Sequence, residues 1–131
     1  MHENSRIEEI VSTLDATLPQ ALDRLCAFLR IPSISTDPEH RGDVRRAAEW
    51  LCAELAGLGF AAAVRDTPGH PMVVAHSPKG ARRPVLFYGH YDVQPVDPLE
   101  LWDRPPFDPE IQDTPQGRVI RARGAADDKG Q

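Results

Sequence analysis

The segment that most directly indicates chemistry is Gly89-His90-Tyr91-Asp92, which follows an apolar run. His90 and Asp92 are two positions apart, so in an extended chain their side chains point the same way. A neutral imidazole is a good zinc ligand, and a neighbouring carboxylate can fix its tautomer. A His-x-Asp pair also occurs often by chance as a surface salt bridge. The pair alone therefore allows two interpretations, a metal ligand with its orienting acid or an exposed ion pair.

A second candidate lies further along, where Asp127 and Asp128 are adjacent and follow a turn that contains Gly124. Two carboxylates in this position could bind a hard or borderline cation. The same pair is typical of a helix N-terminus, with Asp127 as the N-cap and Asp128 favoured by the helix dipole. For this pair taken alone, we favour the helix-terminus interpretation.

The elements that must position these motifs begin with two amphipathic helices. Apolar residues recur at three- and four-residue steps from Ile7 to Leu29, and Pro19 within them predicts either a kink or the start of a further helix. Another helix is expected from about Asp43, as its N-cap, to Leu58. Its apolar face would consist of Val44, Ala47, Ala48, Leu51, Leu55 and Leu58.

Shorter apolar runs separated by proline and glycine predict strands at residues 60–65, 72–76 and 84–88. The run 84–88 is continuously apolar, as a central buried strand would be. Residues 111–123 predict a hairpin that turns at 114–117. Helices followed by strands indicate a layered α/β fold, with helices packed on a mixed sheet that the end of the chain cuts short.

Composition narrows the classes of function. The 131 residues carry a net charge of −5 and no basic stripe, which argues against a nucleic-acid partner. No apolar run reaches membrane-spanning length, and the first residues do not resemble a signal peptide, so we expect no membrane partner and a cytoplasmic location. Cys26 and Cys52 are expected to be buried thiols in a reducing compartment rather than a disulfide.

Several segments, taken in order, resemble the signature segments of one family. They are residues 30–35, 89–95, the pairs Leu101-Trp102 and Pro106-Phe107, and 123–130. The family is that of two-zinc metallopeptidases, which includes carnosine-type dipeptidases, carboxypeptidase G, aminoacylase and succinyl-diaminopimelate desuccinylase. The matches at 93–95 and 127–130 point to its dipeptidase branch. The resemblance covers essentially all of residues 1–131 and implies that they form the N-terminal part of the catalytic domain.

The resemblance implies a role for each motif residue. His90 is then a ligand of one zinc ion, Asp127 is the carboxylate that bridges both zinc ions, and Asp92 is the catalytic aspartate that orients His90. Asp128 and Lys129 help to hold the ligand loop, and the peptide between Asp127 and Asp128 is expected to be cis. The other histidines match no motif position and are expected to be solvated or structural; they are His2, His40, His70 and His76.

For the complete enzyme, the resemblance implies hydrolysis of the amide bond of dipeptides or related acyl-amino acids. Two zinc ions would activate a water molecule and a glutamate would take its proton. In the family that glutamate, the remaining ligands and an inserted dimerisation domain all lie further along. We therefore expect the complete enzyme to be a homodimeric dizinc dipeptidase, of which residues 1–131 are the front part. Alone, these residues are expected to bind at most one zinc ion, weakly, and to be inactive.

Two other interpretations stay open. The chain could be a non-catalytic truncated remnant that acts, if at all, as a binding partner. It could also be an unrelated small α/β binding module with a chance resemblance, which the number of matching segments disfavours. Downstream coding sequence that contains the family's general-base glutamate, the zinc-ligand glutamate next to it and its late histidine would separate the enzyme from the remnant.

Overall fold

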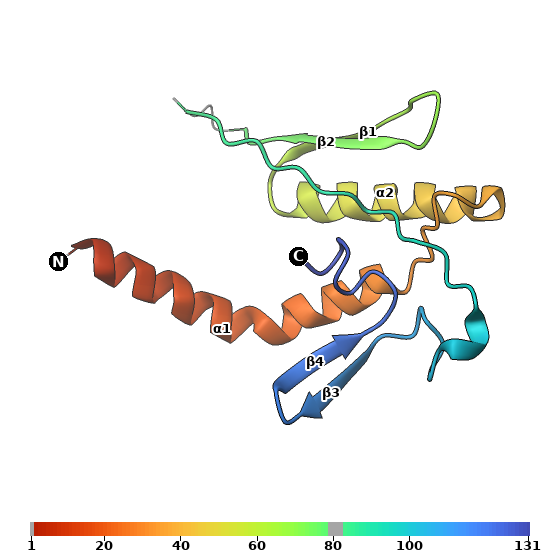
Figure 1. The fold of residues 1–131 in the computed structure, drawn as a ribbon. Helices are drawn as coiled ribbons and strands as arrows, with labels where there is room; N and C mark the ends of the chain where they lie inside the picture. The colour runs from red at the N-terminus through yellow and green to blue at the C-terminus, as the bar shows by residue number, and fades with distance from the viewer. Residues whose placement is uncertain (1, 79–82) are drawn as a thin grey trace.

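The computed structural model describes residues 2–78 and 83–131, and in it helices and hairpins form layers (Figure 1). The β1–β2 hairpin lies on one side of helix α2, and helix α1 and the β3–β4 hairpin lie on the other. The layered α/β class is therefore confirmed. The elements are α1 (His2–Leu29), α2 (Arg41–Gly57), β1 (Ala61–Arg65), β2 (Met72–His76), β3 (Glu110–Thr114) and β4 (Gly117–Arg121), with short 3-10 helices at Pro38–His40 and Leu99–Leu101.

Helix α1 is continuous through Pro19, which confirms the kink rather than a second helix. Proline offers no N–H to the carbonyl four residues earlier and its ring crowds that carbonyl, so the helix bends there. Figure 1 shows the bend midway along α1. The apolar stripe before the bend is 49–62% exposed, whereas Phe28 and Leu29 after it are buried. Only the second part of α1 therefore packs into the core of the described chain.

Helix α2 begins at Arg41, so the prediction that Asp43 is its N-cap is wrong. The residue at the cap position is His40, whose side chain makes no capping hydrogen bond. The chain enters α2 directly from the 3-10 helix Pro38–His40, and Asp37 caps that helix instead. The start of helical structure thus moves upstream and leaves Asp43 in the first turn. The predicted apolar face is confirmed at Val44, Ala47 and Ala48, which are buried.

The core between α1 and α2 is built around an aromatic stack. Phe28 and Trp50 have ring centroids 4.6 Å apart and an interplanar angle of 10°. Ile31 and Ala47 are buried beside Phe28, and Tyr91 packs against the same cluster. Because Tyr91 directly precedes Asp92 and follows His90, this core fixes the position of the first candidate motif.

Two hairpins follow the predicted strand pattern. Strands β1 and β2 pair antiparallel from Ala61 opposite His76 to Arg65 opposite Met72. Strands β3 and β4 pair antiparallel around the predicted turn, with Thr114 opposite Gly117. The strands of the described residues thus form two separate antiparallel pairs, and outside them Ile34 and Val93 form a single parallel bridge.

The prediction of a buried central strand at residues 84–88 is wrong for this structure. The segment is extended but unpaired, and its four residues from Val85 to Tyr88 are 84–93% exposed. Figure 1 shows it running past α2 without joining either hairpin. A strand requires hydrogen-bonding neighbours, and neither pair of strands in the described chain supplies one. Apolar composition alone therefore did not determine burial.

Cys26 and Cys52 are both free, and each is partly rather than fully buried. Across residues 2–78 and 83–131, neither long helix has the apolar length that crossing a membrane requires.

Candidate metal centre

His90 and Asp127 converge, as the sequence predicted, although they are 37 positions apart. His90 Nε2 lies 3.1 Å from Asp127 Oδ1. Two donors bound to one zinc ion at about 2.0–2.2 Å with a tetrahedral angle would be about 3.4 Å apart. The observed separation is close to that value, so a small adjustment would let both atoms bind the same ion.

Asp92 lies on the other side of the imidazole ring. Its Oδ1 is 3.1 Å from His90 Nδ1, and its backbone oxygen is 3.2 Å from the same nitrogen. The predicted hydrogen-bond reach between Asp92 and the ring is therefore confirmed. With the proton on Nδ1 donated to Asp92, the lone pair of Nε2 faces Asp127 and is available to a metal ion.

The turn that carries Asp127 is fixed by the two residues after it. Asp128 Oδ2 accepts a hydrogen bond of 2.8 Å from the backbone N–H of His90, so the two motifs are joined directly. Lys129 Nζ donates to the carbonyl oxygens of Phe28 at 3.0 Å and Ile31 at 2.8 Å. The peptide between Asp127 and Asp128 is cis, as the resemblance implied. Asp128 and Lys129 thus hold the loop, as expected.

The first motif is supported by hydrogen bonds from residues 33–35. Ser33 Oγ donates to the backbone oxygen of Tyr91 at 2.7 Å, and its own carbonyl accepts from the Val93 N–H at 2.9 Å. Ser35 Oγ donates to Asp92 Oδ2 at 2.5 Å. Sequence reasoning included this segment only as part of the resemblance and missed the contact of Ser35 with Asp92. No local pattern indicated it, since the two residues are 57 positions apart.

The charges around His90 determine its protonation. Burial alone lowers the pKa of His90, but hydrogen bonds with Asp92 and Asp127 and the negative charges of Asp92 and Asp128 outweigh burial. The pKa of His90 is therefore raised from its ordinary 6.5. An imidazolium between two carboxylates is favoured in the metal-free chain, so a metal ion must compete with a proton.

The residues present fit one end of a metal site but do not complete it. In the part of the chain that the structure describes, no group of three or more His, Cys, Asp or Glu side chains is arranged to hold a metal ion. Zinc sites in enzymes use three protein ligands and leave one position for water. The imidazole of His90 and the carboxylate of Asp127 are both chemically suitable zinc ligands and could supply two of the three.

The loop between the two motifs is held by Trp102. Its indole Nε1 donates to the backbone oxygen of Val96 at 2.9 Å, and the guanidinium of Arg123 lies 4.9 Å from the centroid of its ring. A cation over an indole ring is attractive, particularly where water is excluded. Trp102 therefore packs the connecting loop against Arg123, two residues after β4 ends.

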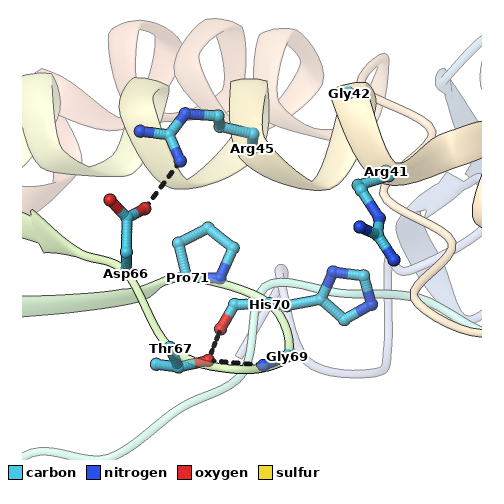
Figure 2. Close-up of a pocket in the computed structure, with 8 residues that line it drawn as sticks. All are labelled: Arg41, Gly42, Arg45, Asp66, Thr67, Gly69, His70 and Pro71. Atoms are coloured by element: carbon cyan, nitrogen blue, oxygen red, sulfur yellow. Dashed lines mark hydrogen bonds and ion pairs between the residues drawn. The ribbon is translucent and has the colours of Figure 1, made fainter.

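A separate hollow of about 340 Å³ lies between the start of α2 and the turn that joins β1 to β2 (Figure 2). Arg41 and Arg45 line it from α2, and His70 lines it from the turn. Arg45 pairs there with Asp66 at 2.7 Å. None of the candidate metal ligands lines this hollow. It touches the candidate site only indirectly, because His70 Nε2 donates to the carbonyl oxygen of Ser35 at 2.7 Å.

Known proteins resemble this chain both in sequence and in fold. Residues 86–131 match the sequence profile of peptidase family M20/M25/M40. The Cys-Gly metallodipeptidase DUG1 of Candida albicans is 30% identical over 98% of this chain and 29% of that enzyme. A succinyl-diaminopimelate desuccinylase of Pseudomonas syringae is 39% identical over 86% of this chain and 28% of that enzyme.

The crystal structure of human carnosine dipeptidase 1 superimposes with a TM-score of 0.81 and 26% identity, over 94% of this chain and 28% of that one. The chain spans less than a third of the length of each of these relatives. The matched segment 86–131 contains His90, Asp92 and Asp127. The matched motif, the relatives and the fold together make this chain similar to members of peptidase family M20/M25/M40 over a part of their length.

Proposed function

We propose that this chain contributes one end of the active site of a zinc-dependent hydrolase that cleaves the amide bond of dipeptides or related acyl-amino acids. Residues 1–131 would be the N-terminal part of the catalytic domain. The observation that carries the proposal is the convergence of His90 Nε2 and Asp127 Oδ1, 3.1 Å apart, with Asp92 against the far side of the imidazole. This arrangement aims two zinc donors at one point and fixes the tautomer of one of them.

Each of the three residues has a distinct part in the proposed chemistry. Bound zinc would lower the pKa of a water molecule and polarise the amide carbonyl. Asp92 accepts the hydrogen bond from the Nδ1–H of His90 and so keeps the lone pair of Nε2 free to bind zinc. Asp127 presents one oxygen toward His90, and its second oxygen can face a second ion, as a bridging carboxylate requires.

The site needs groups beyond those that this chain brings together. A two-metal amidase requires terminal ligands for both ions and a general base for the water molecule. His90 and Asp127 account for two ligands, and no other residue of the sequence matches the remaining roles. We propose that the base and the other ligands come from sequence outside these 131 residues, together with a dimerisation domain. Relatives more than three times as long support this view.

The substrate class is drawn from the relatives. One relative is a Cys-Gly metallodipeptidase and one acts on a succinyl-diaminopimelate, so the class comprises dipeptides and acyl-amino acids with a free carboxylate. We favour a dipeptide because the segment Asp127-Asp128-Lys129-Gly130 resembles the dipeptidase branch. A cytoplasmic homodimer acting on such a substrate is the corresponding proposal for the complete protein.

The test compares the 131-residue chain with any longer product of its gene, both loaded with zinc and assayed on Cys-Gly and on an N-succinyl amino acid. We expect hydrolysis only by the longer protein. There, His90→Ala and Asp127→Ala should remove both zinc and activity, and Asp92→Ala should lower turnover more than zinc content.

Two results would contradict the proposal. Turnover by the 131-residue chain alone, abolished by His90→Ala, would mean that the site is completed within it. Full activity in the longer protein carrying Asp127→Ala would remove the metal assignment. If no longer product exists, the non-catalytic remnant is the better interpretation.

A further inference from the structure

Both carboxylate oxygens of Asp92 are engaged, and by different partners. Oδ1 lies 3.1 Å from His90 Nδ1, while Oδ2 accepts a 2.5 Å hydrogen bond from Ser35 Oγ. The terminal torsion of an aspartate is broad, so a carboxylate anchored at one oxygen only can rotate. The hydroxyl of Ser35 fixes the second oxygen and thereby the plane of the group. Asp92 is about 40% exposed at its side chain, so neighbouring packing alone does not restrict that rotation.

Ser35 is itself held in place on two sides. On one side, the preceding residue Ile34 forms a parallel bridge with Val93. On the other, His70 Nε2 donates to the carbonyl oxygen of Ser35 at 2.7 Å. His70 lies on the turn between β1 and β2, where its own carbonyl accepts a hydrogen bond of 2.6 Å from Thr67 Oγ1 (Figure 2). The hydroxyl of Ser35 therefore reaches Asp92 from a fixed backbone.

We propose that Ser35 is a positioning residue for the metal site. By holding Oδ2 of Asp92, it keeps Oδ1 on the Nδ1–H of His90 and leaves Nε2 facing Asp127. The purpose of this arrangement rests on the proposed function, but the arrangement itself can be tested without it. The role belongs to the hydroxyl group of Ser35, and neither the sequence motifs nor the proposed catalytic groups assign one to it.

The neighbouring Ser33 offers a matched control. Its hydroxyl is fully buried and donates to the backbone oxygen of Tyr91 at 2.7 Å, so it supports the same segment without touching Asp92. Removing either hydroxyl deletes one hydrogen bond and loosens the packing beneath the motif. Only the removal of the Ser35 hydroxyl frees the carboxylate. The two variants therefore separate positioning from general support.

The experiment uses the metal-free 131-residue chain with its histidine rings labelled with ¹⁵N. At a pH above the raised pKa of His90, where the ring is neutral, nitrogen chemical shifts give the fraction of His90 with its proton on Nδ1, and the lifetime of that proton reports its hydrogen bond to Asp92. We expect Ser35→Ala to lower the Nδ1–H fraction and to speed exchange of the proton with water by about tenfold, as for loss of a hydrogen bond to a charged group. Ser35→Thr, which keeps a hydroxyl, should restore both values.

The controls decide between the alternatives. Ser33→Ala should lower the unfolding temperature but leave the Nδ1–H fraction and lifetime as in the parent chain. If Ser35→Ala does not fold, Ser35→Cys, a weaker donor, should still give an intermediate exchange rate. Unchanged ring signals in a folded Ser35 variant, or an equal change in Ser33→Ala, would overturn the proposal. A longer protein that binds no zinc would overturn the proposed function and leave this result standing.

Discussion

The buried ammonium group of Lys129 gives this chain a specific dependence of stability on pH. Lys129 is 9% exposed and donates to the carbonyl oxygens of Phe28 and Ile31. Burial lowers its pKa from 10.5 to about 8, and the charge of Asp92 offsets only part of that effect. Because the folded-state pKa lies below the unfolded value, the unfolded chain binds more protons between them. The free energy of unfolding therefore rises with pH across this window.

The size of the effect follows from the shift. At about 1.4 kcal/mol for each pKa unit, the lowering to about 8 corresponds to about 3 kcal/mol in total. The free energy of unfolding should therefore rise by about 2 kcal/mol between about pH 7.5 and pH 9.5. Tyr91 acts in the opposite sense at higher pH, because burial, and then the charge of Asp92, raises its pKa from 10.0. The measurement therefore stays below the pH at which Tyr91 begins to lose its proton.

The assay is urea unfolding of the metal-free chain at these two pH values, for the parent and for Lys129→Met. Methionine keeps the apolar stem and removes the charge, so the variant should lack the rise. It also removes the hydrogen bonds from Lys129 to the carbonyls of Phe28 and Ile31, which keep their backbone donors Ile31 N–H and Ser33 N–H, so stability at both pH values should fall by about 1 kcal/mol for each hydrogen bond lost. The difference in slope, rather than the absolute stability, is the test. Equal slopes in the two proteins would refute the reasoning.

Three further predictions concern other parts of the structure. NMR titration should show the pKa of His90 raised above 6.5, and Asp92→Asn should bring it down; the stability that His90 gains is present below pH 6.5 and lost as pH rises through its folded pKa. Leu29→Ala, at a fully buried position, should cost about 2–5 kcal/mol by thermal unfolding, whereas Leu14→Ala, at 62% exposure, should change stability by less than about 0.5 kcal/mol. Gly124→Ala should destabilise the ligand turn, detected as faster amide exchange there, because φ is +84° and a Cβ would lie 2.7 Å from a methyl carbon of Val93.

Much of the fold was predictable because its signals are local. The apolar face of α2 and the turn of the β3–β4 hairpin depend on residues only a few positions apart. The segment 84–88 was wrongly predicted as a buried strand because burial depends on partners, which periodicity does not report. The start of α2 was misplaced for a related reason: a 3-10 helix capped by Asp37 precedes it, and Asp43 resembles a cap without acting as one.

The candidate site was predictable in part. The convergence of His90 and Asp127 followed from the resemblance, and spacing alone left each motif open to another interpretation. The contacts of Ser35 with Asp92 and of Lys129 with Phe28 join residues 57 and 101 positions apart. A hydrogen bond over such a separation depends on how α1 and the loops pack, and no local sequence pattern carries that information. The sequence therefore identified the principal residues of the candidate site, and the structure identified the residues that hold them in place.

The central claim is that His90 and Asp127 bind the same metal ion. The most direct measurement is a zinc-edge anomalous difference map from crystals of the longest available product of this gene, grown with zinc. We predict a peak at about 2.0–2.2 Å from both His90 Nε2 and Asp127 Oδ1. In that structure Asp92 should remain within hydrogen-bond distance of His90 Nδ1. A zinc ion bound by other residues, with His90 Nε2 and Asp127 Oδ1 still hydrogen-bonded to each other, would contradict the account.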